Sequence, residues 1–225
     1  MLAVTGRAGE STERGSMLVE MVVTLFLLGI VMSVLYTSVS SLTGATEGTS
    51  TRLQNLDEAR LIMAATTKDV RTATSPDSGG SAFLTAKAND LVFYANVNNP
   101  SAAASKVHLL VNGSTELVEQ ITPATNAAGT AACTQQPCSY LPAKTKTRFV
   151  GRFVVNNASQ PLFTYLAVGG TPLTAGTGGL DASQMIQVRS VRVSLAVSKN
   201  HVYSVGTTWM ENTVGLPNVA FQQAT

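Results

Sequence analysis

The chain has 225 residues and a formal net charge of +2, and only 12% of its residues are charged. This weak, balanced charge does not point to nucleic acid as a main partner, because a phosphate-binding surface usually shows a clustered excess of Lys and Arg. The length suits one compact domain with an appendage. Beyond residue 43 the composition is rich in Ser, Thr, Ala, Gly and Asn with scattered β-branched residues, which is typical of a β-rich domain with polar loops.

The first predicted element is an apolar stretch at residues 17–36, interrupted only by Glu20, Thr24, Gly29 and Ser33. Twenty helical residues rise about 30 Å, which spans one hydrocarbon core. The stretch is longer than the apolar region of an ordinary secretory signal, and it has no small-x-small cleavage site at its far end. It therefore predicts a lasting membrane anchor.

Basic residues predict the orientation of this anchor. Arg7 and Arg14 precede it, and the next basic residue is Arg52. Lys and Arg orient a membrane helix, while acidic residues count for little. We therefore expect a single pass through the cytoplasmic membrane, with the N-terminus inside and the C-terminal bulk outside.

A carboxylate lies just inside the front edge of the anchor. An ionised Glu20 in a bilayer costs on the order of a few kcal/mol, and less near the edge. Two interpretations follow. Either Glu20 simply reaches the headgroups, or it awaits a positive partner that appears later.

The letters RGSMLVEMVVTLFLLGIV, at residues 14–31, resemble the class III signal of type IV pilins and pseudopilins. The resemblance implies that a prepilin peptidase cuts between Gly15 and Ser16 and that the new amino terminus is methylated. It makes Glu20 the fifth mature residue, which pairs in a filament with the terminal ammonium of a neighbouring subunit. Such a pair contributes mainly register, because desolvation consumes much of the attraction.

Two differences from the family pattern bear on the kind of subunit. Ser16 stands where Phe or Met is common, and no proline occurs between Gly15 and Pro76. The leader is also less basic than usual. These differences favour a minor subunit, either a minor pilin or a J-type minor pseudopilin, over a major one.

After the anchor, apolar residues recur at helical spacings, namely Leu53, Leu56, Ala59, Met63 and Val70. This stripe predicts that the helix continues through residues 41–75 and packs on the sheet of the following domain. Gly44 and Gly48 are expected weak points where the helix bends or frays, and an end is expected near Thr74.

Beyond residue 76 the apolar pattern alternates with a period of two. Strands are predicted within residues 89–97, 106–121, 147–157, 161–168, 185–200 and 201–210. Asn112 and Gly113 predict a type I′ hairpin turn, and a phase slip near Arg189 predicts a bulge in the longest strand. One long helix followed by a mostly antiparallel sheet predicts an α+β fold, and this order is similar to the pilin fold.

The predicted organisation has four parts. Residues 1–15 form the cleaved leader, residues 16–40 the transmembrane and assembly helix, residues 41–75 its continuation, and residues 76–225 the β-rich extracytoplasmic domain.

The chain has two cysteines, Cys133 and Cys138, in the segment CTQQPC. A local disulfide is favoured because the domain is predicted to be exported, and a pair of free thiols is the alternative. A zinc site would need two further ligands. The only two histidines, His108 and His201, lie in separate strand-like segments.

The sequence nominates no catalytic group and no cofactor. The glycine-rich segment GGTPLTAGTGG lacks the Gly-Lys-Ser/Thr of a phosphate loop and is expected to be a flexible loop. Asp181 is expected to be a solvated loop carboxylate, with a calcium loop as the alternative. Trp209, the one tryptophan, is expected to be a buried anchor, with a partner contact as the alternative.

Two functions of different classes fit these patterns. The first is a structural minor subunit of a type IV pilus or of a related secretion or competence filament. Its implied partners are other pilin or pseudopilin subunits, the prepilin peptidase, the inner-membrane assembly platform and, before assembly, membrane lipid. Nucleic acid would be an indirect partner only of a competence filament. The second is a membrane-anchored binding or sensing domain that never polymerises.

Overall fold

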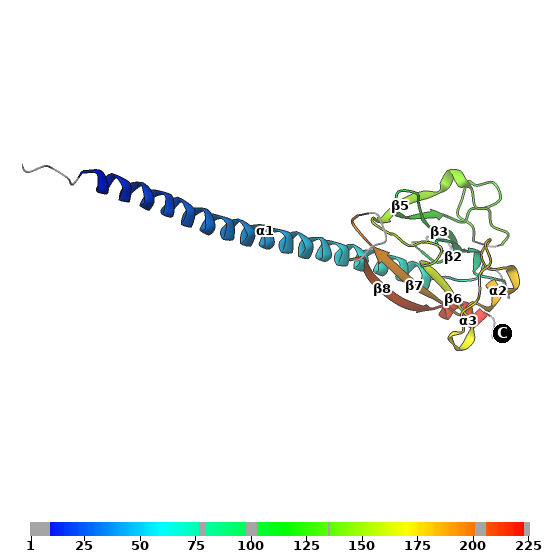
Figure 1. Cartoon of the computed structure of the whole chain (residues 1–225). Coiled ribbons are helices and arrows are strands. Elements are labelled where there is room, and N and C mark those ends of the chain that lie inside the picture. Colours follow the sequence, from blue (N-terminus) through cyan, green and yellow to red (C-terminus); the bar gives the residue numbers. More distant parts are fainter. Residues whose placement is uncertain (1–9, 77–79, 98–102, 135, 201–205, 223–225) are drawn as a thin grey trace, which may run out of the picture. The chain divides into compact units, whose positions relative to one another are not determined.

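The computed structural model describes residues 10–76, 80–97, 103–134, 136–200 and 206–222. The chain divides into two compact units, Met1–Ser50 and Thr51–Thr225. The fold class is the predicted one, α+β, with a long N-terminal helix that packs on antiparallel sheets (Figure 1).

The first element is the helix α1 (Glu10–Arg71), which is continuous over 62 residues. Gly44 and Gly48, the expected weak points, both lie inside it. The helix ends at Arg71, three residues before the predicted end at Thr74. The following backbone turns to pair with a strand, as the Thr74 amide donates to the Tyr94 carbonyl at 2.9 Å.

Five strands form the first sheet in the order β1-β2-β3-β4-β5, and every neighbouring pair is antiparallel. Their bounds are β1 Phe83–Ala86, β2 Asp90–Ala95, β3 Ser105–Val111, β4 Leu117–Thr122 and β5 Lys146–Gly151. Alternate residues are buried along β2, over most of β3 and in the first half of β4, which is the period of two that the sequence displays. The sequence analysis did not predict β1, whose four residues are too few to show a period.

The β3–β4 hairpin forms as predicted, but its turn is of a different type. Val111 pairs with Leu117, so five residues form the loop. The Thr115 amide donates to the Asn112 carbonyl at 3.2 Å, and the one positive φ in the loop, 61°, belongs to Thr115. The Asn112 side chain stabilises this wider turn by accepting from the Ser114 and Glu116 amides at 3.0 and 2.9 Å.

The second sheet has the order β6-β7-β8 and is also antiparallel. It comprises β6 Phe163–Leu166, β7 Ser190–Val197 and β8 Thr208–Gly215. The predicted strand at residues 201–210 falls partly on 201–205, which lie outside the described residues. Short helices complete the chain: η1 Pro142–Lys144, η2 Val168–Gly170, α2 Ala182–Gln187 and α3 Pro217–Gln222.

The bulge predicted near Arg189 is wrong, because the segment before it is the helix α2. Asp181 caps this helix: its side chain accepts from the Gln184 amide, while the Gln184 side chain accepts from the Asp181 amide. This capping box outweighs the β-propensity of the residues that follow. The change of apolar phase therefore marks the passage from a helix to β7.

The core of the globular unit lies between the end of α1 and the two sheets. Buried positions on α1 recur every three or four residues, at Asn55, Ala59, Ile62, Met63, Thr66, Asp69 and Val70. They pack with buried side chains of both sheets, among them Phe93, Leu109, Val193 and Leu195. Leu53, which the sequence analysis placed on this stripe, is 57% exposed, so the buried stripe begins two residues later.

Candidate membrane and assembly helix

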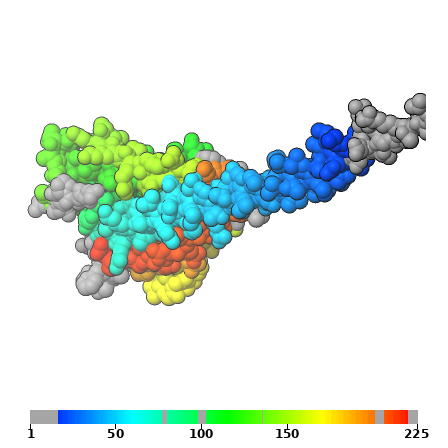
Figure 2. Space-filling model, turned by 90° about the vertical axis from the view of Figure 1, so that its left-hand side faces the viewer, coloured from blue at the N-terminus to red at the C-terminus, as the bar shows by residue number. Residues whose placement is uncertain are grey.

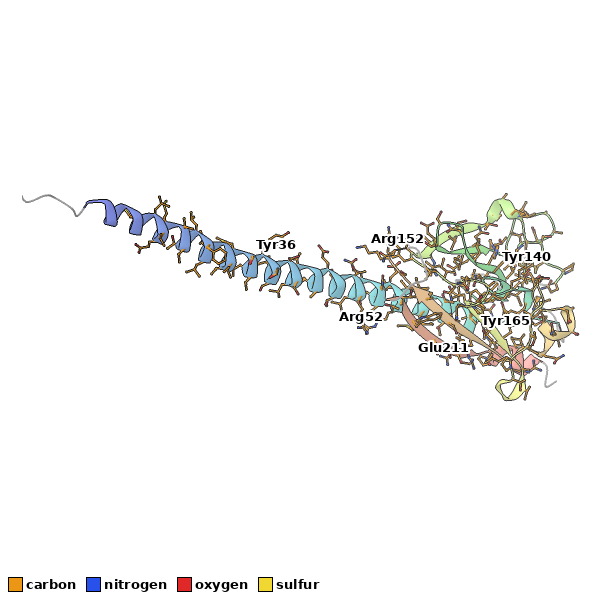
Figure 3. The ribbon with its side chains drawn as sticks, viewed as in Figure 1. Tyr36, Arg52, Tyr140, Arg152, Tyr165 and Glu211 are labelled. Carbon is orange, nitrogen blue, oxygen red and sulfur yellow. A yellow bond between two sulfur atoms is a disulfide. The ribbon has the colours of Figure 1, made fainter. Side chains whose placement is uncertain are left out.

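The first part of α1 is predominantly apolar over residues 17–36. Every described side chain at residues 17–50 is exposed, including large ones such as Phe26, Leu35 and Tyr36 (Figure 3). Among the described residues, this helix alone is long and apolar enough to cross a membrane, by length and composition. A soluble helix buries its apolar side chains in a protein core, whereas these side chains lack such a core and suit lipid or neighbouring helices.

Seven hydroxyl groups of this segment donate to carbonyl groups within the helix. Thr24, Ser33 and Thr37 each donate to a carbonyl three residues back, at 2.8–2.9 Å. Ser38 and Thr43 donate to carbonyls four residues back at similar distances. A hydroxyl with an intrahelical partner needs no water, so these residues are compatible with a hydrocarbon surrounding.

The residues predicted for processing and assembly all lie on α1. Gly15 and Ser16 belong to its helical backbone, and the structure does not describe their side chains. Glu20 lies on the exposed apolar segment. Among the described residues, none forms a salt bridge with Glu20.

The last part of α1 is fixed in the globular unit by hydrogen bonds at several points. The Glu58 carboxylate accepts from the Arg152 amide at 2.7 Å, and the Asn55 side chain accepts from the Lys199 amide at 3.1 Å. One turn after Glu58, Ile62 lies directly against Gly151, where a Cβ would come within 2.2 Å of the Ile62 side chain. The end of β5 thus approaches α1 as closely as only glycine permits.

A buried charged cluster also joins α1 to the first sheet. Asp69 on α1 and Glu119 on β4 are 1% and 0% exposed, and Arg148 on β5 contacts both carboxylates. Burial, then the hydrogen bond and charge of Glu119, raise the pKa of Asp69 to about 7. Two buried carboxylates with one cation cannot both ionise cheaply, so Asp69 holds a proton below neutral pH.

The sequence pattern did not predict this cluster, although both acids occupy positions on an apolar phase. Asp69 falls beside Val70 on the buried stripe of α1, and Glu119 falls on the buried phase of β4 next to Leu117. A carboxylate on an apolar phase is a signal of a buried ionisable group. What the sequence alone could not supply is the long-range pairing of α1 with β4 and β5.

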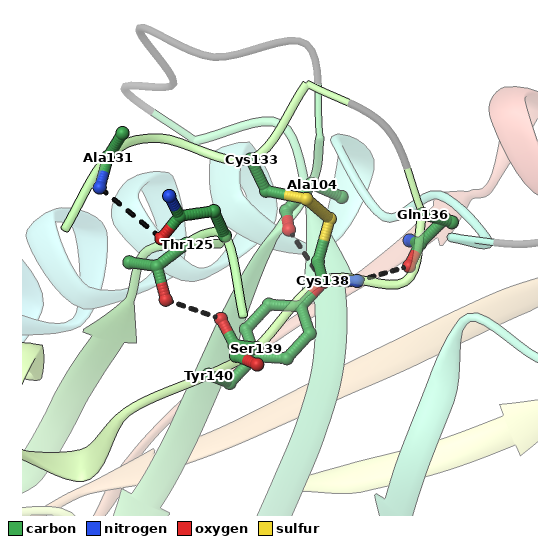
Figure 4. The surroundings of a disulfide bond; sticks show 9 residues. Ala104, Thr125, Ala131, Cys133, Gln136, Cys138, Ser139 and Tyr140 are labelled. Carbon is green, nitrogen blue, oxygen red and sulfur yellow. Dashed lines mark hydrogen bonds between the residues drawn. A yellow bond between two sulfur atoms is a disulfide. The ribbon is translucent and has the colours of Figure 1, made fainter. Parts of the chain in front are cut away.

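The predicted disulfide is present between Cys133 and Cys138, with the Cα atoms 5.7 Å apart (Figure 4). Hydrogen bonds fix the loop around it. The Thr125 hydroxyl donates to the Ser139 carbonyl at 3.0 Å, and the Tyr140 hydroxyl donates to the Ala104 carbonyl at 3.0 Å. The bridge therefore secures a loop that is tied to the first sheet.

The structure also decides the remaining single-residue expectations. Trp209 is 43% exposed on β8, so the prediction of a buried anchor is wrong; it shares its phase on the strand with the exposed residues Glu211 and Thr213. Asp181 is the cap of α2, and its hydrogen bonds with Ser183 and Gln184 lower its pKa. His108 contacts Asp90 at 2.7 Å. No group of three or more candidate metal ligands occurs among the described residues.

Comparison with known proteins gave no match to a family model, to a curated protein or to a solved structure.

Proposed function

We propose that the chain is a structural minor subunit of a type IV pilus or of a related secretion or competence filament, of the minor pilin or J-type pseudopilin kind. A prepilin peptidase removes residues 1–15 by cutting between Gly15 and Ser16. Before assembly, the apolar part of α1 anchors the mature chain in the cytoplasmic membrane. It then enters the filament through the same helix, with its β-rich domain outside the cell.

One observation carries the proposal. A single helix, α1, has all its described side chains exposed over residues 17–50 and contributes a buried stripe to the globular unit after residue 54. An anchor alone needs only about 20 apolar residues to cross a membrane. Here the 18 residues 37–54, all of them exposed except the half-buried Thr51, separate residues 17–36 from the buried stripe, a length that suits packing against helices of neighbouring subunits.

Glu20 has a specific task in this proposal. Cleavage before Ser16 removes the polar leader and creates an ammonium group four residues away from Glu20 in the sequence. In the filament the Glu20 carboxylate of one subunit meets the terminal ammonium of its neighbour. Apolar packing among helices leaves axial register undefined, and the ion pair specifies it.

The matched test replaces Glu20 with Ala or Gln and, as a control, replaces Glu47, a second carboxylate on the exposed part of α1, with Ala. The amounts of protein in sheared filaments and in the membrane fraction are then compared. Both Glu20 variants should reach the membrane and lose their leader normally, yet fall roughly tenfold or more in filaments, because one unpaired buried charge costs several kcal/mol. Glu47→Ala should behave like the wild type.

The second candidate function is a membrane-anchored binding or sensing domain that does not polymerise. It is favoured by the position of Glu20, near enough to the front edge of the apolar segment to reach the headgroups. On that account Glu20→Ala leaves function intact, and no sheared fraction contains the chain.

A further inference from the structure

An open groove runs between α1 and β8 in the globular unit. Its volume is about 530 Å³, and its walls include Arg60, Ala64 and Lys68 of α1 and Met210 and Asn212 of β8. A second hollow of about 520 Å³ shares Thr67, Arg71 and Asn212 with the first and continues along β8 to Leu216. In Figure 2 the cyan end of α1 and the red β8 lie side by side on this face.

The groove has a marked positive charge. Arg60, Lys68 and Arg71 line its first part and Arg189 its second, and no Asp or Glu is among the lining residues of either. Arg60 pairs with the exposed Asp57 at 3.8 Å. Within the described part of the chain, Lys68 and Arg71 have no salt bridge. The groove is therefore complementary to an acidic ligand.

One edge of β8, whose residue Thr213 lines the second hollow, carries backbone groups that do not face β7. The Ser194 amide donates to the Leu162 carbonyl on the β6 side, so the backbone groups of the even-numbered residues of β7 face β6. The odd-numbered residues of β7 therefore face β8, and accordingly the Arg189 carbonyl accepts from the Leu216 amide. Their partners on β8 are even-numbered. The N–H and C=O groups of Glu211 and Thr213 consequently point away from β7.

The described residues offer these outward groups no backbone partner. Among the described residues, no backbone hydrogen bond links residues 210–215 to anything except β7. A strand edge of this kind is a template for a further strand. Its alternating donors and acceptors match a polypeptide, because the phosphates of a nucleic acid could use the donors but not the carbonyl acceptors.

We propose that the groove between α1 and β8 binds an extended, acidic polypeptide segment of a partner protein, which adds a fourth strand to the second sheet beside β8. Backbone hydrogen bonds to Glu211 and Thr213 set the register of the segment. Its acidic side chains on one side face Lys68 and Arg71, and this gives the site its selectivity. The proposal does not depend on filament assembly, since an anchored domain would bind in the same way.

The test measures binding of a fluorescein-labelled seven-residue peptide of alternating Glu and Val to the full chain in non-ionic detergent micelles, by fluorescence anisotropy. Three comparison ligands accompany it: the same peptide with Lys for Glu, the Glu peptide N-methylated at its central residues, and a single-stranded oligonucleotide. The Glu peptide should bind at least roughly tenfold more tightly than each of the three and lose affinity as salt is raised.

Protein variants test the two parts of the site separately. Arg71→Glu should weaken binding of the Glu peptide roughly fivefold or more by charge reversal, whereas Lys144→Glu, an exposed change on η1, should have no effect. Thr213→Pro removes an outward N–H without removing a bond to β7, and it should weaken binding to a similar extent. If this variant does not fold, the N-methylated peptide tests the same hydrogen bonds on the wild type.

The proposal is overturned if the Glu peptide does not bind, if its Lys or N-methylated version binds equally well, or if the oligonucleotide binds more tightly. It is also overturned if folded Arg71→Glu and Thr213→Pro proteins both bind the Glu peptide as the wild type does.

Discussion

At the scale of single residues, Asp69 is a carboxyl group whose ionisation the fold disfavours. The residue occupies a buried position on α1 next to the buried Glu119, and one arginine, Arg148, serves both. The pKa of about 7 means that the folded protein keeps a proton on Asp69 which the unfolded chain releases near its ordinary value of 3.8. The folded state binds more protons between these values, so stability falls as the pH rises from about 4 to 7.

The change Asp69→Asn should remove this dependence, because the amide is neutral at every pH and still donates to Glu119. We expect the variant to exceed the wild type by on the order of 3 kcal/mol in free energy of unfolding at pH 8, with a much smaller difference at pH 4. Denaturant titrations at several pH values measure this, with Asp57→Asn on the exposed side of α1 as the control. Parallel pH profiles for Asp69→Asn and the wild type would contradict it.

Gly151 carries a second residue-scale prediction. A methyl group at this position would collide with Ile62, so Gly151→Ala should lower the free energy of unfolding by about 1–3 kcal/mol. Gly215 is a matched control, because it also ends a strand and a Cβ there meets nothing within 4 Å. Equal stabilities of the two alanine variants in thermal or denaturant unfolding would show that the contact with α1 is not tight.

At the scale of elements, the sequence predicted those whose signal is local. The period of two located β2, β3 and β4, and the apolar stripe after the anchor predicted that α1 continues beyond it. The sequence pattern predicted the wrong element or turn type where a local side-chain hydrogen bond selected one of two possible structures. Asp181 begins α2 in a segment of β-prone residues, and the Asn112 side chain selects a wider turn than Asn-Gly alone suggests. Position along the sequence could not show the exposure of Trp209, which depends on the phase of β8.

The loop closed by Cys133 and Cys138 is the element whose covalent bond is easiest to test. Closing so short a loop removes chain entropy worth about 2 kcal/mol from the unfolded state. The double change Cys133→Ser and Cys138→Ser should lower the free energy of unfolding by about that amount. A reducing agent should have the same effect on the wild type and none on the variant. If complete reduction of the disulfide left the free energy of unfolding of the wild type unchanged, the prediction would be contradicted.

At the scale of the whole molecule, the α+β class followed from the order of a helical period and then a strand period. The division into two sheets and the cluster of Asp69, Glu119 and Arg148 did not follow, because both depend on contacts between residues far apart in the chain. The apolar first part of α1 was visible from composition alone. Its proposed task rests on the leader, the cut site and Glu20 taken together.

The intact mass of the mature protein, purified from its own host, tests this central claim most directly. Trypsin cuts after Arg14 and next after Arg52, so the tryptic peptides that cover the anchor in the uncut and processed chains would differ by Gly15 alone. The intact mass instead separates them by the whole leader. The proposal predicts a chain that begins at Ser16, with or without one methyl group, and that keeps residues 1–15 when the prepilin peptidase is deleted. A chain that begins at Met1 in the wild type, unchanged by loss of the peptidase, would contradict it.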